Sequence, residues 1–225
     1  MSAFFIRIKR LIGLLSVVFT FAVFCYAVAL NNAKTVGTGK TFYFVVSSSE
    51  HIEVSTHLTK WSGGAGYPLA YNNGEYAAYA VYFKEVEGKA AQTSVAETGE
   101  ETEVLALQAN PISFKSRAEK ETATKIVGAF DCLYGCMQVL NGEIARLEKG
   151  ATQESSKRIL QTLARQFSYL ETEHKNTIKG YSSVCENART CLSEITSDIV
   201  YAKDLRYLLC ELSVAYVNLS KNFTL

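Results

Sequence analysis

The sequence predicts an α+β protein that begins with a single N-terminal transmembrane helix, continues with a βαββαβ module and ends in an antiparallel three-helix coiled-coil bundle. Three observations predict this fold class. An uncharged apolar run covers residues 11–30, strand and helix signals alternate through residues 41–109, and apolar residues recur at spacings of three and four in residues 112–225. With 225 residues, 48% of them hydrophobic, the chain is long enough for one large domain or two small ones.

Residues 11–30 form the expected transmembrane anchor, after a cytoplasmic stub of residues 1–10. At a rise of about 1.5 Å per residue, this run spans the roughly 30 Å hydrocarbon core of a bilayer. Three basic residues precede the run: Arg7, Lys9 and Arg10. Because basic residues stay on the cytoplasmic side, we expect a single-pass cell-membrane protein with a cytoplasmic N-terminus and an extracytoplasmic C-terminal part. A cleaved signal peptide is the alternative, since Ala27-Val28-Ala29 supplies small residues for a signal peptidase.

A polar linker, residues 31–40, leads into the mixed module of residues 41–109. Aromatic and β-branched residues mark its strands, Ser47 and Glu50 form a helix capping box, and Asn72-Asn73-Gly74 is a hairpin turn. The expected order is a strand at 42–46, a helix at 52–61, strands at 67–71 and 76–83, a weak helix at 84–95 and a strand at 104–109. This order predicts a four-stranded sheet with two helices on one face.

Charge excludes one class of ligand for this module. Residues 41–109 carry three basic and nine acidic side chains, a net charge of minus six. RNA-recognition modules share the βαββαβ order, but nucleic-acid affinity depends on neutralising phosphates with Lys and Arg. We therefore expect no nucleic-acid partner.

Three segments of the module resemble the SPOR domain, an extracytoplasmic βαββαβ module that binds septal peptidoglycan, particularly glycan strands stripped of their stem peptides. The segments are Phe42 to Ser49, Gly66 to Ala70 and Tyr79 to Lys84. The resemblance implies a membrane-anchored protein that binds peptidoglycan in cell division or sporulation. The helical part would then act as a spacer or assembly domain.

Period-two alternation predicts which strand residues face the two helices and which lie on an open face. The expected helix-facing residues are Phe42, Phe44, Val46, Tyr79, Val81, Phe83, Leu105 and Leu107. The expected open face holds Tyr43, Ala78, Ala80, Tyr82, Ala106 and Gln108. Tyrosine rings with polar tips suit stacking on a sugar chain. We therefore expect four glycan-binding residues: Tyr43, Tyr76, Tyr82 and Gln108.

Residues 112–225 predict three helices joined by short connections, so that sequential helices are antiparallel neighbours. The expected helices cover residues 126–149, 152–179 and 183–219. Interspersed charges on their polar faces identify no ligand. The helical domain offers a surface for a protein partner or for self-association.

Six cysteines are present, of which Cys25 lies in the apolar run. If the first and third helices run parallel, Cys132 and Cys191 lie at one level, and they are the expected disulfide pair. A zinc site is the rival interpretation, but the remaining cysteines lack a Cys-x2-Cys spacing, so we expect no metal.

The sequence contains no motif of an enzyme. His51, His57 and His174 have no recognisable serine or cysteine partner, and neither a zinc-protease motif nor a nucleophile elbow is present. We expect a non-enzymatic protein without a cofactor. The alternative to glycan binding is a structural coiled-coil assembly protein of the cell envelope that binds other proteins only.

Overall fold

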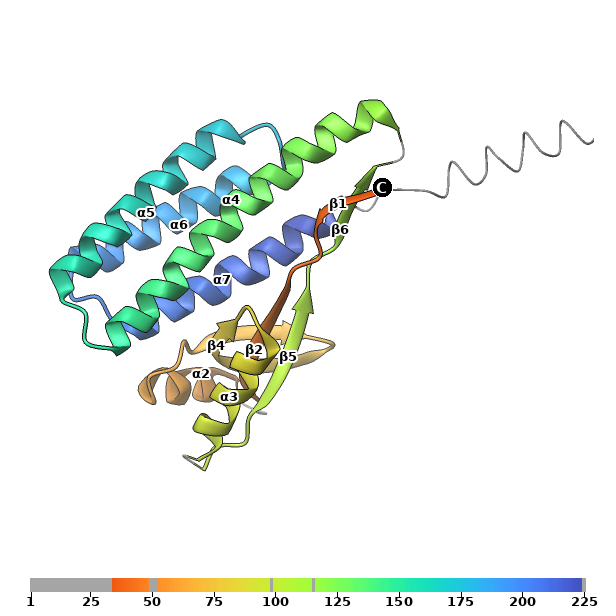
Figure 1. Cartoon of the computed structure of the whole chain (residues 1–225). Helices are drawn as coiled ribbons and strands as arrows, with labels where there is room; N and C mark the ends of the chain where they lie inside the picture. Colours follow the sequence, from red (N-terminus) through yellow and green to blue (C-terminus); the bar gives the residue numbers. More distant parts are fainter. Residues whose placement is uncertain (1–33, 49–51, 98, 115, 224–225) are drawn as a thin grey trace, which may run out of the picture.

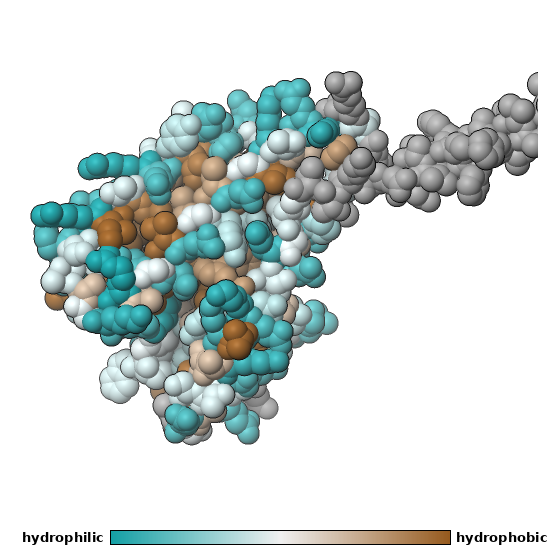
Figure 2. Space-filling model, in the orientation of Figure 1, coloured by the Kyte–Doolittle hydropathy of each residue, from teal (hydrophilic) through white to brown (hydrophobic). Residues whose placement is uncertain are grey.

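The computed structural model describes residues 34–48, 52–97, 99–114 and 116–223 (Figure 1). They form three layers: two short helices, a four-stranded sheet and a helical bundle. The short helices pack on one face of the sheet and the bundle on the other, so both faces contact helices. Figure 2 shows a largely hydrophilic surface with apolar side chains gathered mainly over the bundle.

The mixed module follows the predicted βαββαβ sequence. Its elements are β2 (Thr41–Ser48), α2 (Ile52–Trp61), β3 (Tyr67–Tyr71), β4 (Gly74–Tyr82), α3 (Glu85–Ala96) and β5 (Glu103–Gln108). The strands are ordered β3-β4-β2-β5, and each neighbouring pair is antiparallel, as in a split βαβ fold. Asn72 and Asn73 have φ values of 46° and 65°, the left-handed pair that a tight hairpin turn requires.

The phenylalanine face of the sheet packs on the bundle, which reverses the predicted orientation. The ring of Phe42 lies edge-on to Tyr216, with 5.4 Å between centroids, and also contacts Tyr134. Tyr43, on the other face, lies beneath α3, where a Cβ on Gly88 would come within 3.2 Å of the Tyr43 Cβ. The bundle offers more apolar surface than two short helices, so the bulkier face of the sheet is buried against it.

A β-bulge also changes the face of the sheet on which part of β4 lies. Its pairing with β2 shifts register between Val45, opposite Ala80, and Val46, opposite Ala78. Tyr79 is the extra residue, and it remains on the α2 side, as predicted. Ala78 turns into the core beneath the bundle, although strict alternation placed it on an open face.

A two-stranded antiparallel ribbon joins the module to the bundle. It pairs β1 (Lys34–Thr38), which occupies part of the expected linker, with β6 (Pro111–Phe114). The Thr38 hydroxyl donates to the Asn110 carbonyl, and the Asn110 N–H donates to Ser220 Oγ at 2.8 Å. The ribbon therefore fixes both ends of the module against the bundle.

The bundle contains four helices, which corrects the prediction of three. They are α4 (Arg117–Glu148), α5 (Gln153–Glu173), α6 (Tyr181–Ser197) and α7 (Ala202–Lys221). The expected third helix breaks at Asp198, whose backbone is extended, and Val200 is buried within the break. The Gln153 side chain donates to the Val200 carbonyl at 3.0 Å and accepts from its N–H at 2.8 Å. These bonds replace the helical ones and stabilise the break.

The expected transmembrane helix and membrane localisation require a correction as well. Among the described residues, every helix is too short or too polar to cross a membrane. Residues 11–30, to which the anchor was assigned, and residues 1–10 lie outside the described part of the chain.

Candidate functional site

A cleft of about 700 Å³ lies between β3, β5 and the C-terminal half of α7. The two strands are at opposite edges of the sheet, yet both line the cleft, because the twisted and bulged sheet curls until its edges approach each other. The Tyr71 hydroxyl reaches across this gap to the Ala106 carbonyl, at 3.5 Å. The curl of the sheet thus creates a concave site that a flat sheet would lack.

Polar, uncharged side chains are prominent in the lining of the cleft: Tyr67, Tyr71, Asn72, Gln108 and Asn218. Val214 and Val217 add apolar surface from α7. Lys221 is the single charged side chain among the described lining residues, and its Nζ donates to Asn218 Oδ1 at 3.1 Å. The cleft therefore combines aromatic rings, amide groups and one positive charge.

Tyr67 is held in place from the α7 side. Its ring lies edge-on to that of Tyr207, with 5.2 Å between centroids. Burial raises the pKa of Tyr67 to about 12, and the nearby Glu211 carboxylate acts in the same direction. The Tyr67 hydroxyl is therefore protonated at neutral pH and can donate a hydrogen bond.

The structure separates the four residues predicted to bind glycan. Gln108 is exposed and lines the cleft. Tyr43 is half-buried beneath α3, and Tyr76 packs against the main core. Sequence reasoning missed Tyr67 and Tyr71, although both lie in a predicted strand, since only the curl of the sheet brings them opposite Gln108.

Tyr82 lies in a different hollow, of about 240 Å³, at the end of β4. Arg206 of α7 enters this hollow and donates to Glu148 and to the Gly63 carbonyl. Burial raises the pKa of Tyr82, and the Arg206 charge partly offsets that rise. Arg206 therefore links Gly63 of the module to Glu148 of the bundle.

The expected Cys132–Cys191 disulfide is not formed, because both residues are free thiols. Their helices, α4 and α6, each pack mainly on other helices of the bundle, α4 on α5 and α7 and α6 on α5. Cys132 is exposed, whereas Cys136 and Cys185 are buried. Within the described residues, no three His, Cys, Asp or Glu side chains are grouped so that they could hold a metal ion.

No protein-family model matches the chain, and no curated protein or solved structure matches it either.

Proposed function

We propose that the protein binds a glycan strand of the peptidoglycan type in the cleft between β3 and β5. The supporting observation is the convergence of Tyr67, Tyr71 and Gln108 on a cleft to which the described residues contribute no carboxylate. Uncharged hydroxyl-rich ligands are bound by aromatic faces and by amide groups that both donate and accept hydrogen bonds. We propose this cleft as the binding site instead of the open sheet face on which the sequence predicted that the glycan binds.

Each group in the cleft has a role in this proposal. The Tyr67 and Tyr71 rings supply surfaces for the apolar faces of sugar rings, and the amides of Gln108 and Asn218 pair with hydroxyl and acetamido groups. Glycan strands that have lost their stem peptides carry carboxylates, which the positive charge of Lys221 would attract. The cleft thus suits a stripped strand, which combines exposed sugar rings with such carboxylates.

Co-sedimentation with purified cell-wall sacculi tests the proposal, using the full chain and sacculi with or without amidase treatment. We expect binding that increases after amidase treatment. Tyr71→Ala should weaken binding about tenfold, or roughly 1.4 kcal/mol, through loss of a stacking surface. Tyr169→Ala is the matched control, because Tyr169 is an exposed tyrosine on α5. A chain that sediments with neither form of sacculi would contradict the proposal.

The second candidate function is a structural assembly protein that binds other proteins and no glycan. One observation favours it: α2 carries large apolar side chains on its exposed face. The two functions use different surfaces, so they can be tested separately.

A further inference from the structure

Helix α2 exposes three apolar side chains and buries a small polar one. Val54, Leu58 and Trp61 are 57%, 58% and 93% exposed, whereas Thr59 is 1% exposed. The three apolar residues follow an i, i+4, i+7 spacing, so they share one face of the helix, here called the α2 ridge. Helices in proteins are stabilised mainly by burying such a face. In this fold, that apolar face of α2 is exposed instead of buried.

The α2 ridge is held on a rigid base. The chain after α2 packs so closely that a Cβ on Gly64 would come within 2.8 Å of Thr59 Cγ2. Arg206 of α7 donates to the carbonyl of Gly63 and so ties this segment to the bundle. A ridge that is already fixed loses little conformational freedom when it binds a partner.

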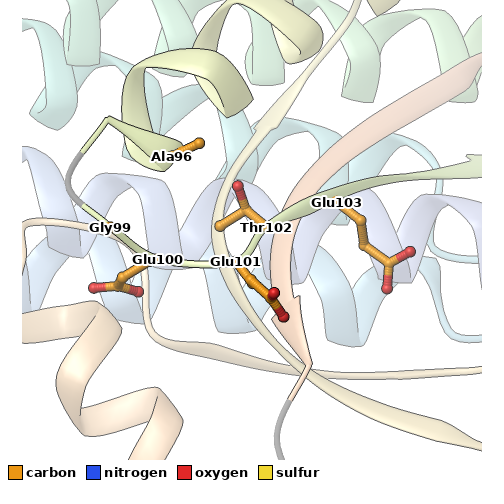
Figure 3. Close-up of a pocket in the computed structure, with 6 residues that line it drawn as sticks. All are labelled: Ala96, Gly99, Glu100, Glu101, Thr102 and Glu103. Carbon is orange, nitrogen blue, oxygen red and sulfur yellow. The ribbon is translucent and has the colours of Figure 1, made fainter.

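A groove of about 550 Å³ runs beside the ridge. It is lined by Leu58 and Trp61 of α2 and by Glu100 and Glu101 of the loop that follows α3. Figure 3 shows the carboxylates of Glu100 and Glu101 projecting from the loop in different directions, and that of Glu103 projecting from the start of β5. Neither Glu100 nor Glu101 forms an ion pair with any residue that the structure describes. The groove therefore offers apolar surface and two uncompensated negative charges side by side.

We propose that the α2 ridge and its groove bind a basic amphipathic helix of a partner protein. The apolar face of that helix covers Leu58 and Trp61, and its Lys or Arg side chains lie beside Glu100 and Glu101. Apolar burial around an exposed tryptophan supplies affinity, and the carboxylates select the charge of the partner. Anionic lipid surfaces and nucleic acids carry the opposite charge to the one required.

Trp61 reports directly on this interaction, because it is the only tryptophan in the sequence. The full chain is titrated with a helical peptide of about five turns, with leucine on one face and lysine on the other. We expect a saturable shift of Trp61 emission to shorter wavelength. A peptide with glutamate in place of lysine should cause no shift, and higher salt should weaken binding of the lysine peptide.

Two variants separate the apolar and charged contributions. The double substitution Glu100→Gln and Glu101→Gln should raise the Kd for the lysine peptide about tenfold, and Leu58→Ser should abolish saturable binding. Glu173→Gln, at an exposed glutamate of α5, is the matched control and should leave the Kd unchanged. The proposal is overturned by no saturable shift, by an equal shift with the glutamate peptide, or by an unchanged Kd in the double variant.

Discussion

At the scale of the residue, two buried tyrosines of the core use their hydroxyl groups differently. Tyr181 Oη donates to the Ala129 carbonyl at 2.8 Å, whereas Tyr216 Oη has no hydrogen-bond partner among the described residues. Burial raises the pKa of both hydroxyls, so both are protonated at neutral pH. A buried polar group without a partner costs about 1–3 kcal/mol, which gives these two residues opposite energetic roles.

Replacing each tyrosine by phenylalanine should reveal that difference. Tyr181→Phe should lower the free energy of unfolding by about 1 kcal/mol, because it removes the hydrogen bond to the Ala129 carbonyl. Tyr216→Phe should leave the free energy of unfolding unchanged or raise it by up to about 1 kcal/mol, since it removes an unpaired hydroxyl. Urea denaturation followed by circular dichroism measures both values. An equal decrease in the free energy of unfolding in the two variants would refute the opposite roles of these two hydroxyl groups.

At the scale of the element, the break between α6 and α7 depends on one side chain of α5. The amide of Gln153 pairs with both backbone groups of Val200, which is 2% exposed. Gln153→Leu should lower the free energy of unfolding by about 2 kcal/mol, because it leaves a buried N–H and C=O unpaired. Hydrogen exchange of the Val200 amide should become faster in the variant.

The control for this prediction is Gln161→Leu, at an exposed position of the same helix. It should change the free energy of unfolding by less than about 0.5 kcal/mol. If both leucine variants lose the same stability, the contacts of Gln153 with Val200 do not hold the break.

Elements with local signals could be predicted, and elements set by distant contacts could not. The turn at Asn72-Asn73-Gly74 and the β-branched strands of the module depend on near neighbours, and their order was predicted. The break between α6 and α7 was missed because Gln153, whose side chain stabilises it, is 47 residues from Val200, and because the apolar spacing continues through the break. In the cleft, alternation indicated Gln108, whereas Val217 and Asn218 depend on how α7 docks on the sheet.

At the scale of the whole molecule, one core joins the module to the bundle. Phe42 of β2 packs against Tyr216 of α7, and the Phe130 ring of α4 lies 4.8 Å from that of Tyr216. All three residues are fully buried. Sheet and bundle are therefore expected to unfold together, as one cooperative unit.

Phe42→Ala should lower the free energy of unfolding by about 3–5 kcal/mol, through lost apolar burial and the cavity left behind. Hydrogen exchange measured by mass spectrometry should show reduced protection in β2 and in α5, although α5 packs mainly on α4 and α6. Retained protection in α5 with a loss confined to the sheet would show two independently folding parts. Tyr169→Ala, at an exposed site, should leave both regions unchanged.

The ribbon of β1 and β6 affects how the mixed module docks on the bundle. Thr38 pairs with Pro111, so the chain enters and leaves the module at the same point. The module is joined covalently to the bundle through β6 and α4, and the pairing of β1 with β6 adds a second, non-covalent attachment. A segment attached in this way is held at a high effective concentration beside its binding surface. The sheet can therefore stay docked on the bundle even when substitutions weaken their shared contacts.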